Sequence, residues 1–191
     1  MTRISVLQPP GRQDAVLPHG YRPRMTAAME QLAEAVYQET TLSFREAEGA
    51  RMRIAHINGC LMCQGYRIAE HLAVALQKMN SAEAPNTSSS RGEPPTEAFY
   101  AAAAGDWRSS EMFSARERLA IEYAERIALE PAGVPYDDGL WDRLHGHFDE
   151  GEIADLTFSI TTWIATGRVV HVLGLDGSCE IHAGSGAVAA E

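Results

Sequence analysis

The sequence predicts an all-α protein, a bundle of about seven helices. Three observations support this prediction. Seven segments place apolar residues at three- and four-residue spacing, no segment shows a convincing strand alternation, and several segments begin or end at recognisable capping residues. The chain has 191 residues, of which 45% are hydrophobic and 22% are charged, so one domain with a substantial core can form.

The first half of the chain begins with a proline-rich segment and continues with three helical patterns. The last of these is followed by a stretch rich in Ser, Pro, Asn and Gly, which is typical of a loop inserted between helices. Asn58-Gly59 marks the end of the second helix. The predicted elements are an extended arm at 1–24, helices at 25–38, 43–57 and 60–79, and the loop at 80–96.

The second half contains four more helical patterns, at 97–107, 114–130, 138–148 and about 150–174. Ser114 and Glu117 match a capping box, Pro131 ends that helix, and Asp149 with Glu152 suggests another capped start. The last helix is apolar nearly all round from 156 to 172, which favours a place in the core or at a subunit interface.

The domain organisation follows from these elements. We expect the helical domain to span 25–175, with a small polar tail at 176–191. Arg168 lies inside the apolar last helix and needs a partner there. The expected partner is a carboxylate of Glu48, Glu117 or Glu122.

The charge balance limits the classes of partner. Sixteen basic residues against 26 acidic residues give a formal net charge of −10, which argues against a nucleic-acid or anionic-membrane surface. No apolar run is long enough for a signal peptide or a membrane span of about 20 residues. We therefore expect a cytoplasmic protein, in which a Cys-x-x-Cys motif favours a reactive or metal-binding pair over a structural disulfide.

The stretch "HINGCLMCQGYR" (56–67) contains two cysteines three residues apart. If one helix starts near Cys60, then Cys60, Cys63, Arg67 and His71 lie on the same face of it. Free first-turn N–H groups and a nearby cation stabilise a thiolate, whereas an ordinary thiol with a pKa of about 8.5 is only ~3% ionised at pH 7. A second thiol three residues away can then resolve an oxidised intermediate as a disulfide.

Glu48 lies twelve positions before Cys60. If the chain turns at Asn58-Gly59, the second and third helices can pack so that Glu48 approaches the cysteines. On spacing alone, a solvated helix face is the better interpretation of Glu48. A catalytic base, if one is needed, would be Glu48, His71 or His56, although His71 is better explained as a partly exposed helix residue.

The segment "EGARMRIAHINGCLMC" followed by "QGYR" resembles the carboxymuconolactone decarboxylase and alkylhydroperoxidase D-like superfamily. In its redox members, a Glu is followed after eleven residues by Cys-x-x-Cys, and a His follows the second cysteine after three more residues. "FSARERLAIEYAERIAL" and "HFDEGEIADLTFSITTWIATGRVVHVLGL" resemble two later helices of that superfamily, so the resemblance covers about 25–175. It implies an all-α fold, a homo-oligomer, and an antioxidant peroxidase or disulfide oxidoreductase.

The resemblance also implies roles for individual residues. The attacking thiol would be Cys63 and the resolving thiol Cys60, and Glu48 matches the glutamate of the motif. The substrate would be a hydroperoxide or a disulfide, with an unidentified thiol as electron donor. The candidate catalytic residues are Cys63, Cys60, Glu48, Arg67 and His71.

This chain departs from the motif at two positions. Arg67 stands where the superfamily has its histidine, and Met62 stands where some members have a second histidine. Arginine cannot accept a proton, but its charge can hold Cys63 as a thiolate or bind an anionic substrate group. The decarboxylase members lack the cysteine pair, so lactone decarboxylation is disfavoured here.

Three alternatives to a redox enzyme remain open. The cysteines could be two small buried residues, or could bind zinc together with Cys179 and His182. The chain could also be a non-catalytic helical oligomer that acts as a redox-sensing or binding module. We predict no cofactor and no metal.

Overall fold

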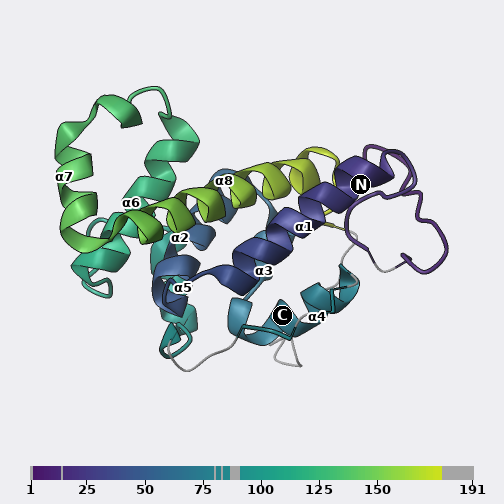
Figure 1. The fold of residues 1–191 in the computed structure, drawn as a ribbon, viewed down its shortest axis with the longest axis horizontal. Helices are drawn as coiled ribbons and strands as arrows, with labels where there is room; N and C mark the ends of the chain where they lie inside the picture. Colours follow the sequence, from purple (N-terminus) through teal and green to yellow (C-terminus); the bar gives the residue numbers. More distant parts are fainter. Residues whose placement is uncertain (1, 14, 80, 83, 87–90, 178–191) are drawn as a thin grey trace, which may run out of the picture.

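The computed structural model describes residues 2–177 except 14, 80, 83 and 87–90, and within these residues it is helical and contains no strand (Figure 1). The all-α prediction is therefore confirmed. The α-helices are α1 (Pro23–Glu39), α2 (Phe44–Ile57), α3 (Leu61–Gly65), α4 (Ile68–Lys78), α5 (Glu97–Ala104), α6 (Ala115–Leu129), α7 (Asp138–His147) and α8 (Glu150–Val172), and a short 3-10 turn, η2 (Val134–Tyr136), precedes α7.

Three helices begin with a capping box, in which the cap side chain accepts from a first-turn N–H and a glutamate reaches back to the cap N–H. The pairs are Ser43–Glu46 in α2, Ser114–Glu117 in α6 and Asp149–Glu152 in α8. Each cap is worth about 1 kcal/mol. The caps predicted at Ser114 and Asp149 are confirmed.

Helix α2 lies at the centre of the fold and packs against α5, α6 and α8, while α1 packs along α8. Figure 1 shows α8 crossing the molecule with α1 beside it and the arm next to α1 at one end. Gly49 allows the close approach of α2 to α6, because a Cβ there would lie 3.1 Å from the Ile121 side chain. The position of α2 matters for function, since this helix carries Glu48 into the core.

The prediction of one helix from Cys60 to Met79 is wrong. Helix α3 ends at Gly65, and α4 begins at Ile68 after two residues with extended backbone, Tyr66 and Arg67. The break has a physical cause, because the Arg51 guanidinium occupies the carbonyl oxygens of Cys63 and Tyr66. In an uninterrupted helix these oxygens would accept from residues 67 and 70.

The predicted ion pair of Arg168 is also wrong. Its guanidinium donates to Asn58 Oδ1 at 3.1 Å and to the Ala128 carbonyl at 3.3 Å. The three candidate carboxylates pair with other arginines: Glu48 with Arg51, Glu117 with Arg45, and Glu122 with Arg143. Arg168 lies on the exposed side of α8, so it needs no buried carboxylate.

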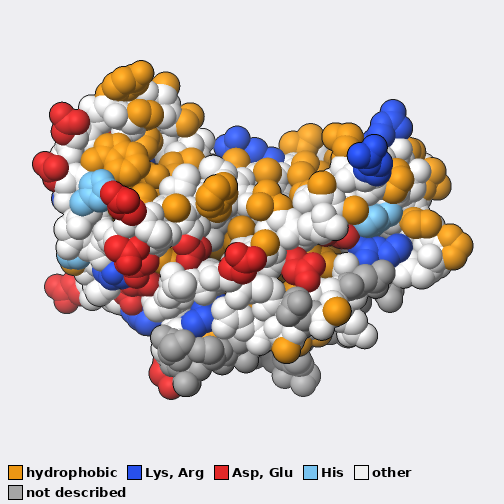
Figure 2. Space-filling model, viewed as in Figure 1, with side chains coloured by type: hydrophobic (Ala, Val, Ile, Leu, Met, Phe, Trp, Pro, Cys, Tyr) orange, Lys and Arg blue, Asp and Glu red, His pale blue; other side chains and the backbone are white. Residues whose placement is uncertain are grey.

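Helix α8 is buried on one side and exposed on the other. Leu156 and Ile160 are fully buried, whereas Phe158 is 64% exposed and Val172 is 69% exposed. Figure 2 shows apolar side chains on the surface of the region that α1 and α8 occupy. Among the described helices, none has the length and apolar character needed to cross a bilayer.

We predict that Leu156→Ala lowers the free energy of unfolding by about 2–5 kcal/mol, because it leaves a cavity beneath α8. The matched control is Leu129→Ala at the end of α6, where the leucine is 57% exposed and the expected loss is below about 0.5 kcal/mol. Urea unfolding followed by circular dichroism measures both. Equal losses for the two variants would contradict the assignment of α8 to the core.

Candidate functional site around the cysteine pair

Cys60 and Cys63 are joined by a disulfide, with their Cα atoms 5.3 Å apart. Cys60 is the N-cap residue of α3, which confirms that this helix starts at the motif. The two sulfurs differ in their surroundings. Cys60 is fully buried in an apolar cluster with Leu17, Val170 and Leu175, whereas Cys63 is partly exposed and lines a pocket.

The turn before the disulfide packs directly against α8. Gly59 has a φ of 68°, which lets the chain reverse after α2 as the Asn-Gly signal predicted. The Asn58 amide donates to the Trp163 carbonyl at 3.1 Å. A Cβ at Gly167 would lie 2.6 Å from Asn58 Nδ2 and 3.6 Å from Cys63 Sγ, so α8 approaches the motif closely only because residue 167 is glycine.

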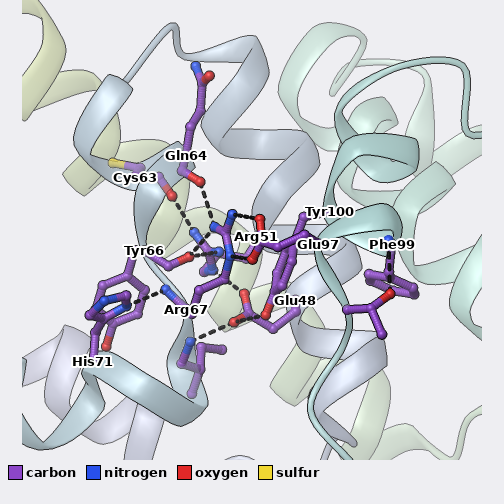
Figure 3. A network of polar contacts seen from close by, with 12 residues as sticks. Glu48, Arg51, Cys63, Gln64, Tyr66, Arg67, His71, Glu97, Phe99 and Tyr100 are labelled. Carbon is purple, nitrogen blue, oxygen red and sulfur yellow. Dashed lines mark hydrogen bonds and ion pairs between the residues drawn. The ribbon is translucent and has the colours of Figure 1, made fainter. Parts of the chain in front are cut away.

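Glu48 is fully buried, so the interpretation of Glu48 as part of a solvated face is wrong. Its carboxylate accepts from the Ile68 N–H at 2.6 Å, from the Tyr100 hydroxyl at 2.8 Å and from Arg51 Nε at 2.5 Å (Figure 3). An isolated charge in the core would cost several kcal/mol, so these three donors are what make the burial tolerable. They also tie α2 to the start of α4 and to α5.

Arg51 connects Glu48 to the cysteine motif, and sequence reasoning missed it. Its two terminal nitrogens donate to the carbonyls of Cys63 and Tyr66, each at 2.6 Å (Figure 3). Arg51 is 3% exposed. The sequence does contain a signal for Arg51. It lies three residues after Glu48 on a predicted helix, and side chains at this spacing are neighbours.

Arg67 does not share a helix face with the cysteines, because α3 ends before it. Its guanidinium forms an ion pair with Glu97 at 2.8 Å and lies 3.9 Å from the centre of the Tyr100 ring. It also donates to the carbonyls of Gln64 and Tyr66. The hydrogen bond to Glu97 raises the pKa of Arg67, and Arg67 in turn lowers the pKa of Glu97. The charge of Arg67 is thus directed towards α5.

His71 lines the pocket at the other side of the helix break. Its Nδ1 accepts from the Arg67 backbone N–H at 2.8 Å, and its ring lies 5.6 Å from the Tyr66 ring. Because Nδ1 is an acceptor, the ring proton is assigned to Nε2. Of the predicted bases, His71 reaches the pocket while His56 is exposed on α2.

The pocket has a volume of about 400 Å³ and is mostly apolar. The arm, α1, α2, α3, α4 and α8 all contribute to its wall, which includes Cys63 and Arg51. Burial raises the pKa of Tyr37 to about 12 and the pKa of Tyr66 well above its usual value. Both hydroxyls are therefore protonated at neutral pH and can act as hydrogen-bond donors.

The zinc alternative depends on Cys179 and His182, which lie outside the described residues. Within 2–177, apart from the gaps given above, no group of three His, Cys, Asp or Glu side chains is placed to hold a metal ion. The two sulfurs of Cys60 and Cys63 are bonded to each other.

Comparisons with known proteins give relatives without an established activity. No family model matches the chain. A segment of 55 residues is 49% identical to the uncharacterized protein YnjA of Escherichia coli, and it spans 29% of each chain. The uncharacterized protein YdfG of Bacillus subtilis is 26% identical over 138 residues, which is 72% of this chain and 79% of YdfG.

The chain is similar in fold to a solved structure. This structure is of a protein of unknown function from Agrobacterium tumefaciens, suggested to be the antioxidant defence protein AhpD. The two align with a TM-score of 0.57 and 21% sequence identity, over 82% of this chain and 92% of the other. The chain therefore has the AhpD-like helical fold that the resemblance predicted.

Proposed function

We propose that the chain is a thiol-dependent peroxidase or disulfide oxidoreductase that cycles the Cys60–Cys63 pair. The observation that carries the proposal is the asymmetry of the disulfide. Cys63 lines the pocket, while Cys60 is fully buried behind it. Only the sulfur of Cys63 is open to a substrate, so Cys63 attacks and Cys60 resolves.

The chemistry balances as a two-electron cycle. The Cys63 thiolate attacks the terminal oxygen of a hydroperoxide, the O–O bond breaks, and the leaving alkoxide takes a proton to become an alcohol. Cys60 then attacks the resulting sulfenic acid, so that the S–S bond forms and water leaves with the proton of the Cys60 thiol. An external dithiol reduces the disulfide and is itself oxidised.

His71 is the proposed hydrogen-bond donor to the developing alkoxide, which takes its proton from solvent. It lies in the pocket with Cys63, and Nε2 carries its proton because Nδ1 accepts from Arg67. Glu48 is less suited to move a proton, since both its oxygens already accept hydrogen bonds. We assign Glu48 and Arg51 the role of positioning residues that hold the carbonyl of Cys63.

One observation favours the redox-sensing alternative. The guanidinium of Arg67 pairs with Glu97 and donates to the carbonyls of Gln64 and Tyr66, so its hydrogen bonds go to these groups and not to the sulfur of Cys63. Without that cation the Cys63 thiolate is less favoured. A chain that forms the disulfide but turns over no peroxide would fit this alternative.

The exposed side of α8 supports the proposal of a homo-oligomer. Phe158 and Val172 are fourteen residues apart, which places them on the same face of the helix. Two large apolar side chains exposed to this degree on one helix suggest a surface that another copy of the chain covers.

We predict that Cys63→Ser abolishes peroxide consumption, whereas Cys60→Ser still reacts once per chain and stops at the sulfenic acid. The reason is that only Cys63 reaches the pocket. Stopped-flow measurement with one equivalent of cumene hydroperoxide, followed by mass spectrometry, distinguishes the two. If Cys63→Ser reacted as fast as the parent and Cys60→Ser were inert, the roles would be reversed. Failure of all three proteins to react would favour the sensing alternative.

We predict that Glu48→Gln lowers the free energy of unfolding by about 3–5 kcal/mol, because it leaves Arg51 charged and unpaired in the core. The matched control is Glu97→Gln, which breaks an ion pair whose carboxylate side chain is 75% exposed and should cost about 0–1 kcal/mol. Urea unfolding of the oxidised proteins measures both. A loss at Glu48→Gln no larger than that of the control would refute the structural role of the pair.

We predict that light scattering at micromolar concentration gives a mass above that of one chain, and that Phe158→Asp shifts it towards the monomer. A charge on the buried face of an interface is costly, which is the basis of this expectation. The control is Tyr136→Asp, since Tyr136 is 85% exposed in η2 and lies outside α8. A monomeric parent protein would contradict the proposed assembly.

A further inference from the structure

The pocket beside Cys63 is lined by one cation that has no partner among the described residues. Lys78 is the single lysine of the chain, and it lines this pocket. Its ammonium makes no ion pair or hydrogen bond with any residue in the described part of the chain. The other charges on the pocket wall are already matched: Glu30 binds Arg12 and His19, and Arg51 binds Glu48 and two carbonyls.

Most of the pocket wall is apolar. Met29 and Ala33 of α1 and Val74 and Ala75 of α4 are among the residues that line it. Lys78 is in the last turn of α4, seven residues after His71, so the two are about 10 Å apart along the helix axis. A wall that carries the Lys78 charge, the Cys63 thiol and otherwise mostly apolar side chains suits an amphipathic molecule. The volume of about 400 Å³ is within the range of small-ligand sites.

Tyr66 also lines the pocket and carries a hydrogen-bond donor that the described residues leave unpaired. The Tyr66 hydroxyl is buried and has no hydrogen-bond partner among the described residues. Burial raises the pKa of Tyr66 well above its usual value, so this hydroxyl keeps its proton. Buried donors are normally satisfied, and an oxygen atom of a bound molecule would satisfy this one. Tyr66 is only three residues from Cys63.

We propose that this pocket binds a medium-chain amphipathic carboxylate. The carboxylate pairs with the Lys78 ammonium, the hydrocarbon chain lies between α1 and α4, and an oxygen at the far end accepts from Tyr66 beside Cys63. This inference deepens the proposed function, because the far end of such a molecule is where Cys63 would react. The binding itself requires no turnover, so it can be tested separately on the oxidised protein.

The first experiment compares decanoate with decanol by titration calorimetry. Decanoate should bind the oxidised protein, and Lys78→Met should weaken its binding about fivefold or more, while Lys78→Arg retains most of it. Decanol, which has no charge, should bind the parent and Lys78→Met equally. The proposal would be overturned if decanoate did not bind, or if it bound Lys78→Met as tightly as the parent.

The second experiment tests the proposed contact with the Tyr66 hydroxyl. A decanoate with a terminal hydroxyl should bind the parent more tightly than decanoate does, and Tyr66→Phe should remove this advantage while leaving the binding of decanoate unchanged. If the hydroxyl gives no advantage in the parent, the orientation proposed for the ligand is wrong.

The third experiment uses the single lysine as a chemical probe. An amine-reactive succinimidyl ester can modify only Lys78 and the chain terminus, and peptide mass spectrometry separates the two. Decanoate should slow the modification of Lys78 but not of the terminus, and decanol should protect much less. Equal protection by both would place the carboxylate elsewhere. Inactivity towards peroxide would leave these binding results intact, so the two proposals fail separately.

Discussion

The buried ion pair between Glu48 and Arg51 is the interaction on which the site depends. Both side chains are almost completely removed from solvent, so each needs every hydrogen bond that the surrounding structure supplies. Glu48 takes its donors from the start of α4 and from α5, and Arg51 takes its acceptors from α3 and the residues after it. The pair therefore joins four helices around the cysteine motif, and loss of either partner leaves an uncompensated charge in the core.

The two cysteines have unequal surroundings because different residues pack around them. Arg51 holds the backbone on the Cys63 side of the motif, while Leu17, Val170 and Leu175 enclose Cys60. The result is one sulfur beside the pocket and one enclosed by apolar side chains. Because this difference is set by the backbone and by packing, it exists before any substrate binds.

Most of the fold could be predicted from the sequence, because helix periodicity and capping are local signals. The caps at Ser114 and Asp149 and the turn at Gly59 were evident for this reason. The break at Tyr66 and Arg67 was not, because it is imposed by Arg51, twelve residues before Cys63. The pairing of Arg67 with Glu97 and of Arg168 with Asn58 likewise depends on tertiary contacts that spacing along one helix does not encode.

Arg51 contacts the motif through carbonyl oxygens, which every amino acid possesses, and not through the side chains of Cys63 or Tyr66. The contact of Arg51 with the helix break therefore does not depend on the side chains of Cys63 and Tyr66, although the Arg67 side chain adds its own hydrogen bonds to the carbonyls of Gln64 and Tyr66. Either side chain can therefore be replaced without removing an acceptor of Arg51.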